Sequence, residues 1–469
     1  MRGTQVAALR DGVPAGLPDA LDVVAGFDEA LVRGFARVGE QDAAALAALA
    51  GALAGTPLGD PVAEAAGKVT AGSVTADHLA VLAGARSALL GAAHDALLGQ
   101  LDAALGRDRS PWPVTDPAGT PAGPEPAAGP AAGARAWLHE VAVTGWRGVD
   151  HDVLTAAGTP IETALAVPGL RRLAVLLDGL AAELRASVPV GTMPQVPARR
   201  WADLWARGML LTQAAPPAAP GTVAVSGRLL PLGVDLHEHD TAVQAQVHAV
   251  LEPADGGPPR LVRTTVGAAK VDTIVGPAVW GLLRACPVLL TALAQRRAVT
   301  VTDVPLHGGD LLWDDGRARL GEPADPFATA RVLLGPATAA PTAPLDRHPV
   351  AIAEPVLVEG RVVRDDDGTL TVDLDGHPVA VDTARLPAGG PLTPDLVATA
   401  TAVLGLLRWD DGWSVQPLAV LAAVKKQPVE AHNGDWADGV TDARVAKAEA
   451  RAGDAVAVLR ERAGRLLRR

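Results

Sequence analysis

Residues 221–253 have the sequence GTVAVSGRLLPLGVDLHEHDTAVQAQVHAVLEP, and this stretch marks a change in the spacing of apolar residues. Before it, apolar side chains recur every three or four residues, which predicts amphipathic helices. From Thr222 onward they alternate with polar residues or form short apolar runs, which predicts strands. The chain is therefore predicted to be a multidomain α+β protein, with a helical N-terminal half and a β-rich C-terminal half.

Two β-rich modules are predicted, over residues 222–335 and 345–424. The first has three strand-like segments, then a helix over residues 276–297, then two or three further strands. In the second, glycines in tight turns separate the strands of a meander. Three strands, a helix and two strands is an order that suits a small β-barrel such as the oligonucleotide-binding (OB) fold. We therefore expect one or two small barrel-like modules.

Each β-rich segment contains the tetrapeptide Trp-Asp-Asp-Gly, at residues 313–316 and 409–412. Asp-Asp-Gly favours a tight turn, so both copies predict hairpins. Two explanations remain open: duplication of one small barrel, or chance, because turn chemistry favours these residues in any hairpin. Trp313, Trp409 and Trp413 are the candidate partner-binding residues, since an exposed tryptophan can anchor an interface. The alternative is that each packs across its own strand pair.

The other segments are predicted to be helical or linking. These predictions are a helical domain at 1–109, a flexible Pro/Ala/Gly linker at 110–133, a second helical block at 134–215 and a polar C-terminal tail or helix at 425–469. The linker has too few large apolar residues to offset the entropy cost of ordering. Trp201 and Trp205 lie four residues apart and would share a helix face. Packing in a core is the favoured interpretation of this pair, and a ligand site is the alternative.

Composition limits the classes of function. The net charge of −12 argues against binding to nucleic acid or to an anionic membrane, because phosphate contacts need clustered Lys and Arg. The single cysteine, Cys286, excludes an internal disulfide and a multi-Cys zinc site. No apolar run of about 20 residues and no secretory signal is visible, so a cytoplasmic location is expected. The scarcity of Lys, Asn, Tyr and Phe indicates a GC-rich, actinobacterial genome.

One short cluster carries the types of side chain that bind metal ions. Asp235, His237 and His239 alternate along a predicted strand, so that their side chains would project from one face and could hold a divalent metal ion. This spacing resembles the strand-end Asp-x-His-x-His of amidohydrolase-type metal enzymes, and the resemblance covers about five residues. It implies a metal-dependent hydrolase built on an eight-stranded barrel. The alternative is that these are polar residues leading into a turn.

The sequence contains no complete catalytic motif. It lacks a phosphate-binding loop, a dinucleotide-binding glycine pattern and a Gly-x-Ser-x-Gly nucleophile motif. His139 and Glu140 begin a zinc-protease motif, but Val143 stands where the second histidine is required. We therefore predict no catalytic residues and no cofactor. The predicted function is that of a non-enzymatic accessory or adaptor protein, which binds another protein in the bacterial cytoplasm and binds neither nucleic acid nor membrane. The metal-dependent hydrolase is the alternative.

Overall fold

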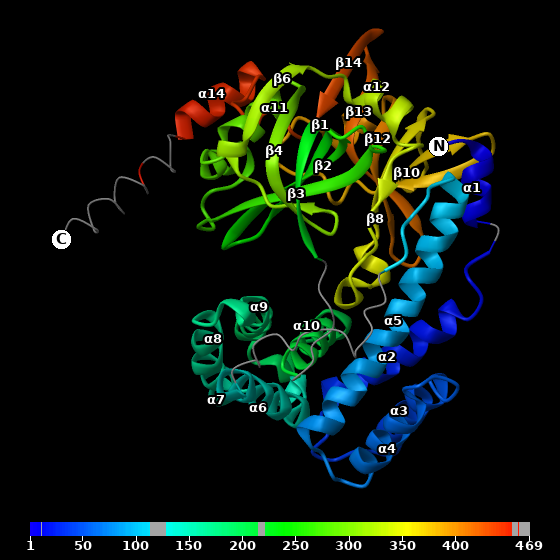
Figure 1. The fold of residues 1–469 in the computed structure, drawn as a ribbon, viewed down its shortest axis with the longest axis vertical. Helices are drawn as coiled ribbons and strands as arrows, with labels where there is room; N and C mark the ends of the chain where they lie inside the picture. The colour runs from blue at the N-terminus through cyan, green and yellow to red at the C-terminus, as the bar shows by residue number, and fades with distance from the viewer. Residues whose placement is uncertain (11, 113–127, 214–220, 453–457, 459–469) are drawn as a thin grey trace.

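The computed structural model describes residues 1–10, 12–112, 128–213, 221–452 and 458. Helices make up the described part of the N-terminal half, and two β-sheets dominate the C-terminal half, which confirms the predicted α+β class (Figure 1). In Figure 1 the sheets lie side by side above most of the helices of the N-terminal half. Within the described ranges, no helix is long and apolar enough to cross a membrane.

The first group of helices ends in one long helix that reaches the sheets. Its members are α1 (Gly3–Arg10), α2 (Leu17–Arg33), α3 (Glu40–Ala52), α4 (Gly59–Thr70) and α5 (Ala76–Leu105). Thr75 caps α5, because its hydroxyl accepts a hydrogen bond from the His78 amide at 3.2 Å. Gly106 ends the helix with φ of 65°, a conformation that glycine adopts without strain. Helix α5 extends from the helical layer to α1 beside the sheets (Figure 1).

The second group of helices completes one apolar core with the first. Its members are α6 (Ala128–Thr144), α7 (His151–Ala156), α8 (Gly158–Leu165), α9 (Arg171–Ser187) and α10 (Ala198–Leu211). Trp201 and Trp205 of α10 are fully buried in this core, which confirms their interpretation as core residues. Most of the predicted linker, residues 113–127, lies outside the described residues, and α6 begins at Ala128 within the predicted linker range.

The first sheet is a closed ring of strands. Its strands are β1 (Thr222–Glu238), β2 (Ala242–Pro253), β3 (Arg260–Ala269), β4 (Arg297–His307), β5 (Asp310–Leu311), β6 (Ala318–Pro323) and β7 (Thr338–Ala339). The order is β1-β2-β3-β5-β4, and β4 pairs back to β1. Strands β3 and β5 are parallel, and the other neighbours in the ring are antiparallel. A 3₁₀ helix, η4 (Gly276–Leu283), and α11 (Pro287–Ala294) connect β3 to β4.

The second sheet has the same strand order. Its strands are β8 (Ala353–Glu359), β9 (Val362–Arg364), β10 (Leu370–Leu374), β11 (His377–Val381), β12 (Ala400–Trp409), β13 (Trp413–Val424) and β14 (Gln427–His432). The path is β9-β10-β11-β13-β12-β8, with β11 and β13 parallel. Only Gly360 and Arg361 separate β8 from β9, so the two act as halves of one bent first strand. Both modules therefore follow the order 1-2-3-5-4-1, as expected for OB-like modules.

The two Trp-Asp-Asp-Gly copies occupy different places in this common order. In the second module, Asp410–Gly412 form the hairpin turn between β12 and β13. In the first module, Trp313 follows β5 and leads into the 3₁₀ helix η5 (Asp315–Arg317). The hairpin predicted at residues 313–316 is wrong, because the flanking strands β5 and β6 pair with β4 and not with each other. In the first module, Gly308–Gly309 form the turn between the fourth and fifth strands, β4 and β5, which is the place that Asp410–Gly412 occupy in the second module.

The parts of the chain pack on one another through shared apolar clusters. Leu232 of β1 and Leu404 of β12 belong to one cluster between the two sheets, and Val6 of α1 and Leu97 of α5 share another with the second sheet. Three shorter helices are α12 (Pro326–Leu333), α13 (Pro394–Val397) and α14 (Ala443–Ala452). In the region predicted as a polar tail, β14 pairs with β13, whereas residues 453–457 and 459–469 lie outside the described residues.

Candidate functional site

Asp235 lies on β1 at the interface between the two sheets and is 2% exposed. Its carboxylate accepts hydrogen bonds from Nη2 of Arg408 at 2.7 Å and from Nε2 of Gln416 at 2.8 Å. Nε2 of His237 lies 3.0 Å from it. Burial opposes ionisation of this carboxyl, but the hydrogen bond and charge of His237 and the charge of Arg408 lower the pKa of Asp235 to about 2. Asp235 is therefore an ionised carboxylate that already has partners.

The structure brings together only part of the predicted metal cluster. Asp235 and His237 are in contact, whereas His239 is exposed beyond the end of β1, where its amide donates to the Ala242 carbonyl at 2.9 Å. Within the part of the chain that the structure describes, no group of three or more His, Cys, Asp or Glu side chains could hold a metal ion. The hydrolase alternative therefore gains no support from the geometry.

Two of the three candidate partner-binding tryptophans lie together. Trp409 and Trp413 are directly opposite each other in the register of β12 and β13, at the base of the hairpin turn. Trp409 is buried and Trp413 is partly exposed. Trp313 is also partly exposed, but it lies in the first module, where its Nε1 donates to Asp315 at 3.0 Å. The structure therefore brings two of the three predicted tryptophans together and places the third elsewhere.

Trp409 and Trp413 line a groove of about 440 Å³, which we call the tryptophan groove. Strands β10 and β11 and the turn Asp411–Gly412 form one side, and helices α1 and α5 form the other. Most of its wall is apolar, with Val6, Leu9 and Leu97 contributed by the helices.

Hydrogen bonds fix the helical wall of this groove. Nε2 of Gln100 donates to the carbonyls of Ala8 and Gly12, at 3.2 and 2.8 Å, and so ties α5 to the end of α1. Nη1 of Arg10 donates to the Pro378 carbonyl at 3.0 Å, which ties α1 to β11. The groove is therefore a built feature of the contact between the helices and the second sheet.

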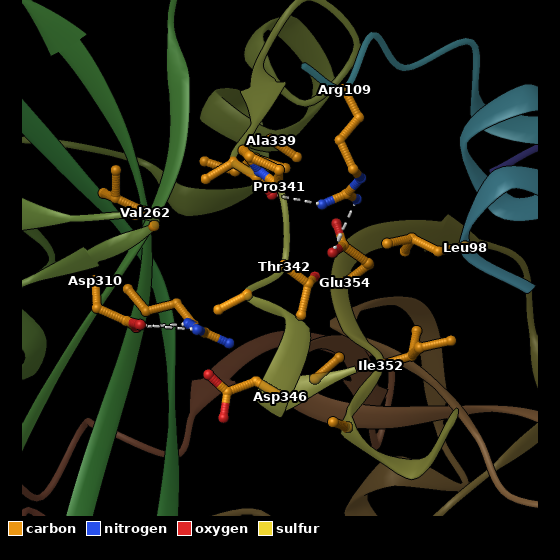
Figure 2. Close-up of a pocket in the computed structure, with 18 of the residues that line it drawn as sticks. Leu98, Arg109, Val262, Asp310, Ala339, Pro341, Thr342, Asp346, Ile352 and Glu354 are labelled. Carbon is orange, nitrogen blue, oxygen red and sulfur yellow. Dashed lines mark hydrogen bonds and ion pairs between the residues drawn. The ribbon is translucent and has the colours of Figure 1, made fainter. Parts of the chain in front are cut away.

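A second cavity, of about 420 Å³, lies where the helices meet both sheets, and we call it the junction pocket (Figure 2). Helix α5 contributes Leu98, the segment after it contributes Arg109, and the first module contributes Val262 and Asp310. The segment between the two modules and the start of β8 complete the wall. Both cavities fall within the size range of about 300–1,000 Å³ that is typical of ligand sites.

The charged side chains that line the junction pocket form ion pairs. Arg263 of β3 donates through Nε and Nη2 to the two carboxylate oxygens of Asp310, at 2.7 and 2.9 Å. Nη2 of Arg109 lies 3.1 Å from Glu354, and Nη2 of Arg172 donates to Oδ1 of Asp346 at 2.5 Å. Figure 2 shows the Arg109–Glu354 pair and the Asp310 pair on opposite walls of the pocket. These pairs join elements that are far apart in the sequence.

His248 is one of two buried histidines that line the junction pocket, the other being His94. His248 lies on β2 opposite Arg263 of β3, is 1% exposed, and has no hydrogen-bond partner at Nε2 within the described residues. Burial and the nearby Arg263 charge lower the pKa of His248 to about 3, so the imidazole is neutral at pH 7. A neutral imidazole has one donor and one acceptor nitrogen. No motif in the sequence indicates this role, because His248 is an isolated histidine in a strand.

The chain matches no protein-family model, no curated protein and no solved structure. The tryptophan groove and the junction pocket are therefore the features of the chain that bear on its function.

Proposed function

We propose that the chain is a non-enzymatic accessory protein that binds another protein in the tryptophan groove. The observation that carries this proposal is the convergence of Trp409 and Trp413 on one apolar groove. Tryptophan is enriched among the residues that dominate binding energy, particularly where it lines a desolvated pocket. Trp413 retains an exposed surface that a partner could cover.

The charge around the groove favours a partner segment with an apolar side chain flanked by Lys or Arg. Residues 346–424 contain 5 Arg and 12 Asp or Glu, a balance of −7. Asp410 and Asp411 are exposed in the turn between the two tryptophans. Asp410 forms an ion pair with Nη1 of Arg199 at 3.8 Å, and Asp411 lines the groove. Complementary charge accelerates encounter and selects among partners. We therefore expect a basic segment whose apolar side chain enters the groove.

The groove is suited to binding rather than to covalent chemistry. The described residues that line it include no Ser, Cys, His or Lys, so Thr371 and Asp411 are its side chains of a type that can act as nucleophile or base. Asp411 and Arg10 are its charged side chains, and Arg10 already donates to the Pro378 carbonyl. These features support the accessory function over a hydrolase in the tryptophan groove.

The test is affinity purification with mass spectrometry from the source cells, using full-length wild type, Trp413→Ala and Trp313→Ala. Trp313 is a matched control, because it is also a partly exposed tryptophan but does not line the groove. The proposal predicts a protein that is recovered with wild type and Trp313→Ala and lost with Trp413→Ala. Equal recovery with all three, or no protein above background with wild type, would contradict it.

A further inference from the structure

The two cavities occupy equivalent positions in the two modules. The tryptophan groove lies against the second and third strands of its module, β10 and β11, and the turn between the fourth and fifth strands. The junction pocket likewise lies against His248 of β2, residues 261–263 of β3 and the Gly308–Gly309 turn. In OB-folds, the face of strands 2 and 3 and the loop between strands 4 and 5 form the ligand-binding surface. The junction pocket is therefore at a position where this architecture binds ligands.

Several polar groups at the junction pocket have hydrogen-bonding capacity that the described residues leave unused. Arg263 donates through Nε and Nη2 to Asp310, and Nη1 donates no hydrogen bond within the described ranges. Asp346 uses Oδ1 for Arg172, and Oδ2 accepts none within those ranges. Nε2 of the buried His248 also has no partner there. Nε2 of His248 is buried, whereas the side chains of Arg263 and Asp346 are 43% and 45% exposed, so a ligand can reach both charged groups.

Charge balance decides what kind of ligand fits. The described lining residues include three arginines, Arg109, Arg172 and Arg263, and three carboxylates, Asp310, Asp346 and Glu354. A ligand with a large net charge of either sign would meet as many repulsive as attractive groups. A small molecule that carries one positive and one negative charge would pair with a carboxylate and with an arginine of the lining.

We propose that the junction pocket binds a free α-amino acid, with its carboxylate at Arg263, its ammonium group at Asp346 and its side chain toward the apolar wall that includes Leu98 and Ile352. Leu98, Asp346 and Ile352 are all seen around this space in Figure 2. This site is separate from the tryptophan groove and does not depend on a partner protein.

The test is isothermal titration calorimetry of full-length protein with each of the common amino acids at millimolar concentration. The α-amide and N-acetyl derivatives of any amino acid that binds test the two charges separately. The variants are Arg263→Gln and Asp346→Asn. The control is Arg228→Gln, because the Arg228–Glu252 pair has similar exposure, lies in the same module and does not line the pocket.

The proposal predicts that at least one amino acid binds and that both derivatives bind at least tenfold more weakly. Arg263→Gln and Asp346→Asn lower the affinity by at least tenfold, while Arg228→Gln leaves it unchanged. Circular dichroism of each variant confirms that it is folded. Absence of heat from every amino acid, or binding that is equally strong in both pocket variants, would overturn the proposal. Neither result would affect the tryptophan groove, whose test uses different residues.

Discussion

Arg408 of β12 donates a hydrogen bond to Asp235 of β1 at 2.7 Å, and this ion pair joins the two β modules. Gln416 supports it from the neighbouring strand, because its Nε2 donates to the second Asp235 oxygen and its Oε1 accepts from Nε of Arg408, at 2.8 and 2.5 Å. The carboxylate that the sequence places in a metal cluster therefore serves as a buried link between modules.

Replacing Arg408 with Met is expected to destabilise the protein by about 3 kcal/mol, because it removes the arginine from the buried Asp235 carboxylate and leaves His237 and Gln416 as its partners. Urea unfolding measures this loss. Arg228→Met is the control, since the exposed Arg228–Glu252 pair is expected to contribute less than about 1 kcal/mol. Equal stability of the two variants would show that Asp235 does not depend on Arg408.

A second buried ion pair holds the helical core. Arg86 of α5 donates through Nε and Nη2 to the two carboxylate oxygens of Asp28 of α2, at 2.6 and 2.8 Å, and both side chains are almost completely buried. Arg86→Met is expected to cost about 3–5 kcal/mol in the free energy of unfolding. The double variant Arg86→Met/Asp28→Leu should recover much of this loss, because no uncompensated charge remains. A double variant less stable than Arg86→Met would contradict this account.

His248 is expected to make stability depend on pH. Its pKa is lowered to about 3 in the folded protein by burial, against about 6.5 in the unfolded chain. Below pH 6.5 the unfolded chain binds a proton that the folded protein does not, so the free energy of unfolding falls as the pH falls. Between pH 7 and pH 5 this residue is expected to cost about 2 kcal/mol.

Urea unfolding at pH 7 and pH 5 measures this effect. His248→Gln should lose about 2 kcal/mol less than wild type on acidification, because glutamine does not titrate in this range. His151→Gln is the control, since His151 is exposed, and it should behave like wild type. A pH dependence that is the same in His248→Gln and wild type would exclude His248 as its source.

Elemental analysis distinguishes the metal-dependent hydrolase from the accessory protein. Protein purified without chelators is expected to contain no stoichiometric zinc, manganese or iron, because Asp235 is held by Arg408 and His239 lies beyond the end of β1. One bound ion per chain that is lost in His237→Ala would contradict this expectation and favour the hydrolase.

Local patterns predicted much of the fold, but not its long-range contacts. The change of period at Thr222 predicted the helical and β-rich halves, because side-chain spacing follows directly from helix and strand geometry. The hairpin predicted at Trp313 failed, since turn chemistry does not determine which strands then pair. Asp235 resembled a metal ligand because two histidines are its neighbours in sequence, whereas its partner Arg408 is 173 residues away.

The two cavities could be predicted only in part. Trp409 and Trp413 were identified from their turn, but the helical wall opposite them comes from the first hundred residues of the chain. The junction pocket draws on several distant segments, and its arginines carried no signal in a chain where arginine replaces most lysines. Such sites depend on tertiary packing, which the spacing of residues within one element does not encode.

The most direct test of the proposed function is the affinity of the recovered partner for wild type, Trp413→Ala and Trp313→Ala, measured by isothermal titration calorimetry. We predict that Trp413→Ala weakens binding by about 2 kcal/mol or more, as expected for a tryptophan at the centre of an interface, and that Trp313→Ala binds as wild type does. Equal affinity of wild type and Trp413→Ala would show that the tryptophan groove is not the partner-binding site.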